Sequence, residues 1–301
     1  MNFSFCKCFF ASALVAFAII VASASSCFAQ ASAFYAQFFQ DRYLTNPAMA
    51  GLDKGFNLDL GYQQQFTAVS GSPKIQYLTA DYNVGGNVGL GFNLNSGQDG
   101  LINTTRVMGT YAYHVPLSLD DKLNFGLSLG VNDSYIDDSK IQGDQNDLSV
   151  YRFNQRTIYF DGDLGASYTS NQLNVQLAIP NLKTLLFKNN DEQNLQADRS
   201  VFYSAVSYKM ESTADDNGFT IEPLVAFRGF KNAQSILDAG ANFDFPQYDF
   251  NLSGMYHTNQ SATFALGLTF SPVDAFFAYS LNMAQVTTLN NTFEIGLKIK
   301  L

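Results

Sequence analysis

The sequence contains no tryptophan, only two histidines and only three cysteines. All three cysteines, Cys6, Cys8 and Cys27, lie close to the amino terminus. A mature chain that begins after them has no thiol for a disulfide, a thiolate metal site or a nucleophile. Cysteine chemistry is therefore excluded from the mature protein.

Positive charge is also scarce, with 17 lysine and arginine residues against 26 aspartate and glutamate residues. Nucleic-acid binding needs a basic face that neutralises phosphates, so no nucleic-acid partner is expected. Hydrophobic residues make up 47% of the chain and charged residues only 14%, which is unusual for a soluble domain. No apolar run in the mature chain is long enough for a spanning helix, so the apolar residues must be interleaved with polar ones.

The amino terminus has the order of a secretory signal peptide. Lys7 precedes an apolar run over residues 9–21, and small residues then lead to a cleavage position after Ala29. The alternative is a lipoprotein acylated at Cys27, but a large apolar residue is required three positions earlier, where Ala24 stands. We therefore predict a cleaved signal peptide.

Beyond this segment the dominant period is two, which indicates strands. At the carboxyl terminus five apolar residues alternate with polar residues or glycine: Phe293, Ile295, Leu297, Ile299 and Leu301. The alternation recurs, with variable quality, over residues 56–63, 75–83, 87–94, 105–114, 123–131, 160–168, 173–179, 202–208, 219–227, 237–243, 248–257, 264–270, 277–281 and 293–301. We predict about fourteen strands of roughly eight to eleven residues, which suits tilted strands crossing a bilayer.

A soluble β-sandwich would alternate as well. Phenylalanine and tyrosine at strand ends, with glycine, asparagine, serine and aspartate on the second face, favour a membrane barrel instead, although tryptophan is common in such aromatic girdles. We predict an all-β, transmembrane antiparallel β-barrel in the cell outer membrane, closed by pairing of the last strand with the first. The expected division is a signal peptide over 1–29, an N-terminal periplasmic segment over 30–54 and the barrel over 55–301. An even number of strands would place both termini of the mature chain in the periplasm.

The expected connections fall into two classes. Short hairpin turns are predicted at residues 83–87, 169–172 and 271–272, and longer loops at residues 95–104, 132–157, 181–200 and around 258–261. Long loops face outside the cell in such barrels. The segments Ile136–Arg156 and Leu182–Arg199 are therefore candidates for a partner-binding surface, and either could equally fold into the lumen as a plug.

Residues suited to catalysis are few. The two histidines, His114 and His257, lie near strand ends, where interface or loop-base positions explain both. An outer-membrane hydrolase would need one of them in register with a serine on an adjacent strand. No metalloprotease, zinc-cluster or nucleophile-elbow motif is present. We predict no enzymatic activity, no catalytic residue and no cofactor.

Charged residues lie in two settings. Acidic clusters occur in the predicted loops, where calcium could use their oxygens, but none has the twelve-residue spacing of a calcium loop, so solvated charge is the favoured interpretation. Within strands the charged residues on the expected inner face are Asp59, Asp161, Asp163, Arg228, Glu294, Lys298 and Lys300. Such a lumen can be bridged internally and closed, or wet and conductive.

One segment, residues 37–52, has no strand period. It contains a Tyr-Leu-x-Asn-Pro-Ala-x-Ala-Gly run from Tyr43 to Gly51, between the signal peptide and the first strand. This run resembles the opening of the PorP/SprF family of the type IX secretion and gliding system of Bacteroidetes. The likeness continues through Gln63–Phe66 and Gly71–Gln76 to about residue 131, and it departs from the family pattern at residues 95–100.

The resemblance implies an outer-membrane barrel component of type IX secretion that helps export a partner surface adhesin or anchors it at the cell surface. Secretion-machinery subunits and outer-membrane lipid are the other implied partners. A passive or fatty-acid-type channel is the alternative function. Residues of the run are the candidates for partner docking: Tyr43, Asn46, Pro47, Ala48 and Gly51.

The local chemistry of this run predicts a turn. Proline fixes its own φ and pushes Asn46 toward an extended conformation, while Gly51 can adopt a positive φ. The segment is expected to be either a docking motif for periplasmic machinery or a tether or plug at the periplasmic mouth of the barrel.

Overall fold

The computed structural model describes residues 37–65, 71–141, 148–155, 158–186, 200–212, 218–230, 234–283 and 291–301. The predicted signal peptide lies outside the described residues. None of the described helices has the length and apolarity to cross a membrane.

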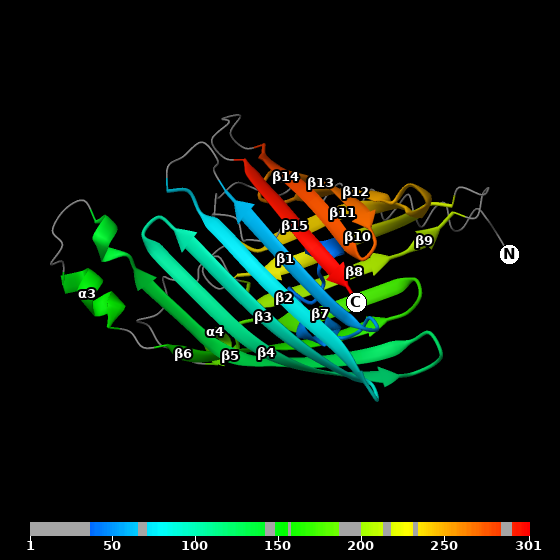
Figure 1. Cartoon of the computed structure of the whole chain (residues 1–301), viewed down its shortest axis with the longest axis horizontal. Coiled ribbons are helices and arrows are strands. Elements are labelled where there is room, and N and C mark those ends of the chain that lie inside the picture. The colour runs from blue at the N-terminus through cyan, green and yellow to red at the C-terminus, as the bar shows by residue number, and fades with distance from the viewer. Residues whose placement is uncertain are drawn as a thin grey trace.

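The chain forms one antiparallel sheet that closes on itself (Figure 1). Its strands are β1 (Phe56–Gln64), β2 (Lys74–Gly85), β3 (Val88–Asp99), β4 (Ile102–Pro116), β5 (Lys122–Ile136), β6 (Tyr159–Thr169), β7 (Leu173–Ile179), β8 (Phe202–Tyr208), β9 (Met210–Glu211), β10 (Thr220–Gly229), β11 (Ile236–Phe245), β12 (Phe250–His257), β13 (Ser261–Phe270), β14 (Val273–Asn282) and β15 (Thr292–Lys300). β8 and the two-residue β9 are separated only by Lys209 and both pair with β10. Together they occupy the place of a single strand in the barrel wall, and the barrel therefore has fourteen strands.

Closure is made by the first and last strands, as predicted. β1 pairs with β15 from Asn57 opposite Lys300 to Gln64 opposite Phe293, and the backbone N–H of Phe56 donates to the carbonyl of Leu301 at 2.8 Å. Every other strand pairs with the wall position before it and the one after it in the chain. None of the described wall strands is therefore left as a free edge, which is the condition for a sheet to be stable in hydrocarbon.

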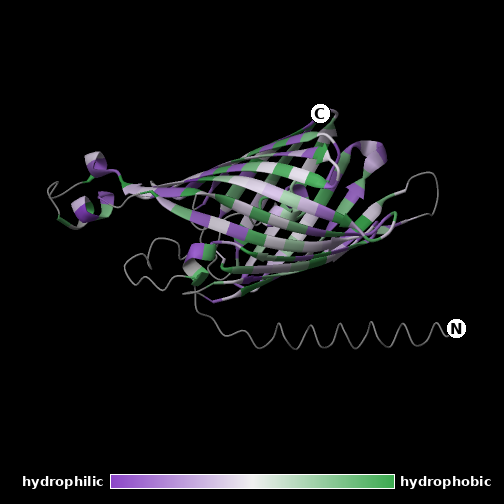
Figure 2. Ribbon diagram, turned by 90° about the horizontal axis from the view of Figure 1, so that it is seen from below, coloured by the Kyte–Doolittle hydropathy of each residue, from purple (hydrophilic) through white to green (hydrophobic). Residues whose placement is uncertain are grey.

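The burial of side chains is the reverse of that in a soluble protein. Large apolar residues on one face of the strands are exposed, for example Leu90 in β3, Leu129 in β5 and Phe264 in β13. Polar residues on the other face, for example Thr79 and Asn124, are buried. Figure 2 shows the two classes alternating along the strands. The apolar outer face is suited to lipid and the polar inner face to a lumen, which excludes the dry middle of a sandwich.

The described residues before β1, 37–55, contain two short helices, α2 (Gln37–Gln40) and the 3-10 helix η1 (Pro47–Met49). Three more lie in the connections after β5 and β7, namely the 3-10 helix η2 (Asp138–Lys140), α3 (Leu148–Asn154) and α4 (Leu182–Leu186). Another 3-10 helix, η4 (Pro246–Tyr248), joins β11 to β12. In Figure 1, α3 stands beyond the tips of the strands. Strand direction places the connections that carry α3 and α4 at the end of the barrel opposite Phe56 and Leu301.

Two predicted loops are wrong. Residues 95–104 are mostly strand, because β3 continues to Asp99, β4 begins at Ile102, and the chain turns at Gly100 with a φ of 58°. The connection around residues 258–261 is likewise a short turn between β12 and β13. Polar residues and glycine predict a loop there, but in β3 Asn95, Gly97 and Asp99 share the inner face with the buried Asn93, and Ser96 and Gln98 continue the outer face past Leu94. The predicted strand length is also too short for β4 and β5, which have 15 residues each.

The outward position of Leu129 gives a first testable prediction. Leu129 lies at the middle of β5 and is 62% exposed. Leu129→Arg should lower the free energy of unfolding by about 2 to 4 kcal/mol, because a charge at mid-membrane depth leaves water on folding. The measurement is reversible urea unfolding in the presence of phospholipid vesicles. Leu119→Arg, in the fully exposed turn between β4 and β5, is the control and should change little. Equal effects at the two positions would contradict a lipid-facing β5.

Candidate functional site

Residues 37–52 lie inside the ring of strands and contact its inner wall (Figure 1). All five docking candidates of the sequence are buried there: Tyr43, Asn46, Pro47, Ala48 and Gly51. The structure thus brings all five candidates together against the wall. Docking of a partner by these residues stays a prediction.

The start of the segment packs on an apolar patch of the inner wall. The ring of Phe38 stacks on that of Tyr203 with centroids 6.2 Å apart, and the guanidinium of Arg228 lies 5.6 Å from the Phe38 centroid. The patch is built from small and apolar side chains on β7, β8, β10 and β12: Ala178, Tyr203, Ala205, Leu224, Ala226 and Met255. Next in the chain, Arg42 forms an ion pair with Glu222 of β10.

The predicted turn at Asn46 is confirmed. Asn46 is extended, with φ −143° and ψ 113°, and Pro47 opens η1. The Asn46 side chain accepts a hydrogen bond from the backbone N–H of Ala48 at 3.0 Å and donates to the carbonyl of Ala166 on β6 at 3.3 Å. Asn46 therefore caps the helix and binds it to the wall with the same amide group.

Tyr43 extends this attachment to β4 and β5. Its hydroxyl is 2.7 Å from the hydroxyl of Thr110, which is 2.6 Å from that of Ser128. Burial raises the pKa of the Tyr43 phenol above its usual range, so the phenol stays neutral in the lumen. The three hydroxyls form a chain that satisfies buried polar atoms without a net charge.

The end of the segment is held by β2 and β4. Gly51 has a φ of 66°, as predicted, and its N–H donates to Asp81 at 2.9 Å while its carbonyl accepts from Asn83 at 2.7 Å. His114 Nε2 donates to the carbonyl of Ala50 at 3.1 Å, and His114 Nδ1 lies 2.9 Å from Asn124. The buried His114 side chain therefore holds the end of the segment by a hydrogen bond from β4.

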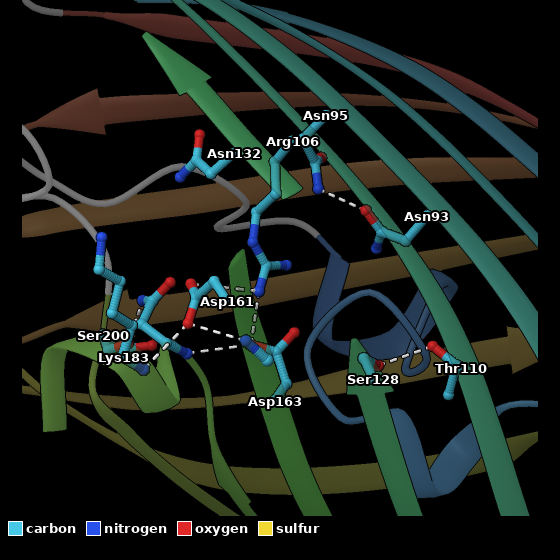
Figure 3. A network of polar contacts seen from close by, with 12 residues as sticks. Asn93, Asn95, Arg106, Thr110, Ser128, Asn132, Asp161, Asp163, Lys183 and Ser200 are labelled. Carbon is cyan, nitrogen blue, oxygen red and sulfur yellow. Dashed lines mark hydrogen bonds and ion pairs between the residues drawn. The ribbon is translucent and has the colours of Figure 1, made fainter. Parts of the chain in front are cut away.

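Nearer the end of the barrel that lies away from Phe56 and Leu301, Arg106 is the centre of a polar network (Figure 3). Arg106 lies 2.7 Å from Asp163 and 3.7 Å from Asp161. These two carboxylates also accept the backbone N–H groups of Asn181 and Lys183, each at 3.0 Å. The network fixes the start of α4 against β6, so part of the predicted segment Leu182–Arg199 lies against the inner wall. Its residues 187–199 lie outside the described residues.

A second network joins β10 to β14. Arg228 forms two hydrogen bonds of 2.7 Å with Asp238, and His257 Nδ1 lies 2.6 Å from the same carboxylate. His257 Nε2 is 2.9 Å from Thr263, whose hydroxyl is 2.7 Å from that of Ser280. Carboxylate, imidazole and hydroxyl follow one another here in the order used by acyl-transfer enzymes.

The surroundings of this network do not resemble those of a catalytic nucleophile, which a substrate has to reach. His257 and Asp238 have no exposed surface, and Arg228 occupies both oxygens of the carboxylate. In this arrangement the network connects five neighbouring strands. Among the described residues, no group of three or more histidine, cysteine, aspartate or glutamate side chains is placed to hold a metal ion.

Six of the seven charges predicted to face inward are buried or half-buried on the inner wall, whereas Lys300 at the end of β15 is largely exposed. Asp59 lies 3.4 Å from Lys298, and Glu294 accepts from Tyr77 at 3.3 Å. Arg106 was not among the inner charges that we predicted. Alternation with Met108 and Thr110 along β4 is the signal that would have placed it inside.

A closed barrel with an apolar outer face and a polar inner face is an integral membrane protein of the β-barrel class, and such barrels belong to outer membranes. The chain belongs to the family of type IX secretion system membrane proteins called PorP/SprF, whose family model matches residues 27–299. The resemblance seen in the opening segment is therefore confirmed over almost the whole chain.

A comparison with curated proteins finds no match. Solved structures give distant matches. Outer membrane protein Omp33 of Acinetobacter baumannii is 7% identical with a TM-score of 0.45, covering 82% of this chain and 99% of that one. The toluene transporter TbuX of Ralstonia pickettii is 10% identical with a TM-score of 0.43, covering 86% and 93%. At these scores the likenesses support no argument about function.

The network around Asp238 gives a second prediction. Asp238→Asn should destabilise the barrel by about 3 to 5 kcal/mol, because it leaves the buried Arg228 guanidinium without its counter-charge. Asp274→Asn is the matched control and should cost less than about 1 kcal/mol, since its partner Lys300 is largely exposed. Urea unfolding of the two variants in the same vesicles checks the difference. Similar costs for the two substitutions would show that Asp238 carries no special structural role.

Proposed function

We propose that this protein anchors a partner adhesin at the cell surface, or helps to export it, as an outer-membrane barrel component of type IX secretion that catalyses no reaction. The family match over residues 27–299 is the observation that carries the proposal. The filled lumen agrees with it, because a passive channel needs an open path and residues 37–52 occupy the path here.

The connections at the end opposite Phe56 and Leu301 are the proposed partner surface. With both termini in the periplasm, this end would face outside the cell. The connection after β5 carries α3, whose Leu148 and Tyr151 are 56% and 62% exposed. Exposed aromatic and aliphatic side chains on a projecting helix are the kind of groups that anchor protein interfaces.

The base of this connection is held in a defined way. The Asn154 side chain accepts from the backbone N–H of Ile136 at 2.8 Å and donates to the Ile136 carbonyl at 2.9 Å. Asn154 thus pairs with the backbone of Ile136 at the last residue of β5. The two hydrogen bonds fix where α3 leaves the barrel, so α3 presents its exposed side chains from a fixed point on β5.

The five candidates in the N-terminal segment belong to a second proposed contact, with periplasmic subunits of the secretion machinery. Tyr43, Asn46 and Ala48 are buried against the wall. Contact with a subunit through these side chains would require the segment to leave the lumen, and the adhesin surface at α3 does not depend on that step.

The test is capture from detergent-solubilised outer membranes of the native host with an affinity tag inserted at Leu119, a fully exposed residue at the end opposite α3. The unaltered protein should capture a large secreted surface protein or secretion-machinery subunits. The double variant Leu148→Asp, Tyr151→Asp should reduce capture of the surface protein about tenfold or more, since two interface anchors contribute roughly 1 to 2 kcal/mol each.

The control is Tyr248→Asp, an equally exposed tyrosine in η4 on the terminal side of the barrel. It should leave capture of the surface protein unchanged. Capture of nothing by the unaltered protein would reject the proposed function. Undiminished capture by the double variant would reject α3 as the contact.

A further inference from the structure

The N-terminal segment spans the lumen from one side of the wall to the other. Its first half contacts β12, where the amide of Gln40 donates to Asn251 at 3.2 Å, and β15, where Lys298 donates to the carbonyl of Gln40 at 3.2 Å. Its second half contacts β6 through Asn46 and β2 through Gly51. β6 and β15 lie on nearly opposite sides of the ring of strands, so the segment crosses the lumen.

The inner wall is shaped to receive this segment. A Cβ on Gly89 would lie 2.0 Å from the carbonyl oxygen of Ala50, and a Cβ on Gly126 would lie 2.2 Å from the carbonyl carbon of Pro47. A Cβ on Gly165 would lie 2.0 Å from the side-chain oxygen of Asn46. Strand interiors disfavour glycine unless another part of the chain approaches closely, as the segment's backbone does at Gly89 and Gly126 and its Asn46 side chain does at Gly165.

The segment is separable from the barrel. Its own backbone hydrogen bonds are local, such as Asn46 N–H to Arg42 at 3.1 Å and Met49 N–H to Asn46 at 3.0 Å. The wall is complete without it, because β1 pairs with β2 and β15 by itself. The link to β1 passes through the exposed residues Asp53 and Lys54 and through Gly55, with a φ of 88°. Withdrawal would therefore break side-chain contacts and leave every strand pairing intact.

The wall behind the segment carries mainly negative charge. Among the described strand residues, the buried side chains of Asp, Glu, Lys and Arg are five carboxylates, Asp59, Asp81, Asp161, Asp238 and Glu294, and two guanidinium groups, Arg106 and Arg228. The half-buried Lys298 lies beside Asp59, and the half-buried Asp163 lies beside Arg106, so the excess of carboxylates remains. Withdrawal would also remove Arg42 from Glu222 and the Gly51 N–H from Asp81. A water-filled path past an excess of carboxylates attracts cations and repels anions.

We propose that residues 37–52 are a plug that seals the lumen against ions, and that its withdrawal opens a cation-selective pore. The glycine positions of β3, β5 and β6 form the seat of the plug, and the link at Asp53–Gly55 is its hinge. This conduction is an activity separate from partner anchoring, and it does not depend on which protein the barrel binds.

The test is single-channel recording in planar bilayers with a KCl gradient. The unaltered mature protein should be nearly silent. Two variants should show conductance steps, namely a deletion of residues 30–51 and Gly126→Val, whose side chain takes the place of Pro47 in the seat. The reversal potential of both variants should shift toward the potassium equilibrium potential.

The matched control is Gly109→Val on β4, because a Cβ on Gly109 meets no atom closer than 4.0 Å. It should remain as silent as the unaltered protein. Heat-modifiable migration on gels establishes that each variant is a folded barrel. Steps of full size from the unaltered protein, silence of the folded deletion variant, or a reversal potential on the chloride side would each overturn the proposal. Capture of a partner has no bearing on any of these readouts, so the two proposals fail independently.

Discussion

The whole structure depends on the closure of the sheet between β1 and β15. Hydrocarbon offers no hydrogen-bond partner to a backbone N–H or C=O, so a sheet is stable there only when its two edge strands pair with each other. Eight residues of β1 pair with eight of β15. Because side chains alternate across a strand, closure divides the chain into residues that meet lipid and residues that meet the lumen.

The same closure creates a second constraint, on the inside. The lumen wall is lined with polar and charged side chains, and a buried polar atom is costly unless it has a partner. The barrel meets this need partly with ion pairs such as Arg106 with Asp163. Its own N-terminal segment supplies further partners, the N–H of Gly51 to Asp81 and the carbonyl of Ala50 to His114. Wall and segment are therefore complementary parts of one lumen.

Much of the fold could be predicted because its main signal is local. Each of the fourteen alternating stretches contains a strand, and the extended Asn46 and the positive φ of Gly51 follow from the chemistry of single residues. The prediction was wrong at residues 95–104, because serine, glycine and aspartate are residue types that are typical of loops. They belong to β3 because its pairing with β4 continues as far as Asp99 opposite Ile102, with Asn95 and Gly97 on the inner face and Ser96 on the outer face. The composition of a short stretch does not show how far a hairpin extends or which face of a strand meets the lumen.

The sequence by itself determined the class of the protein, since a period of two, the scarcity of charge and the lack of long apolar runs leave few stable solutions in a membrane. It also contained the opening motif that identifies the family. Only the tertiary structure decided where that motif lies and what it contacts. Gly126 and Gly165 are far from Pro47 in the chain, and their lack of side chains has meaning only when closure brings β5 and β6 against the segment. Such contacts depend on barrel diameter and register, which are properties of the closed sheet and of no single stretch of residues.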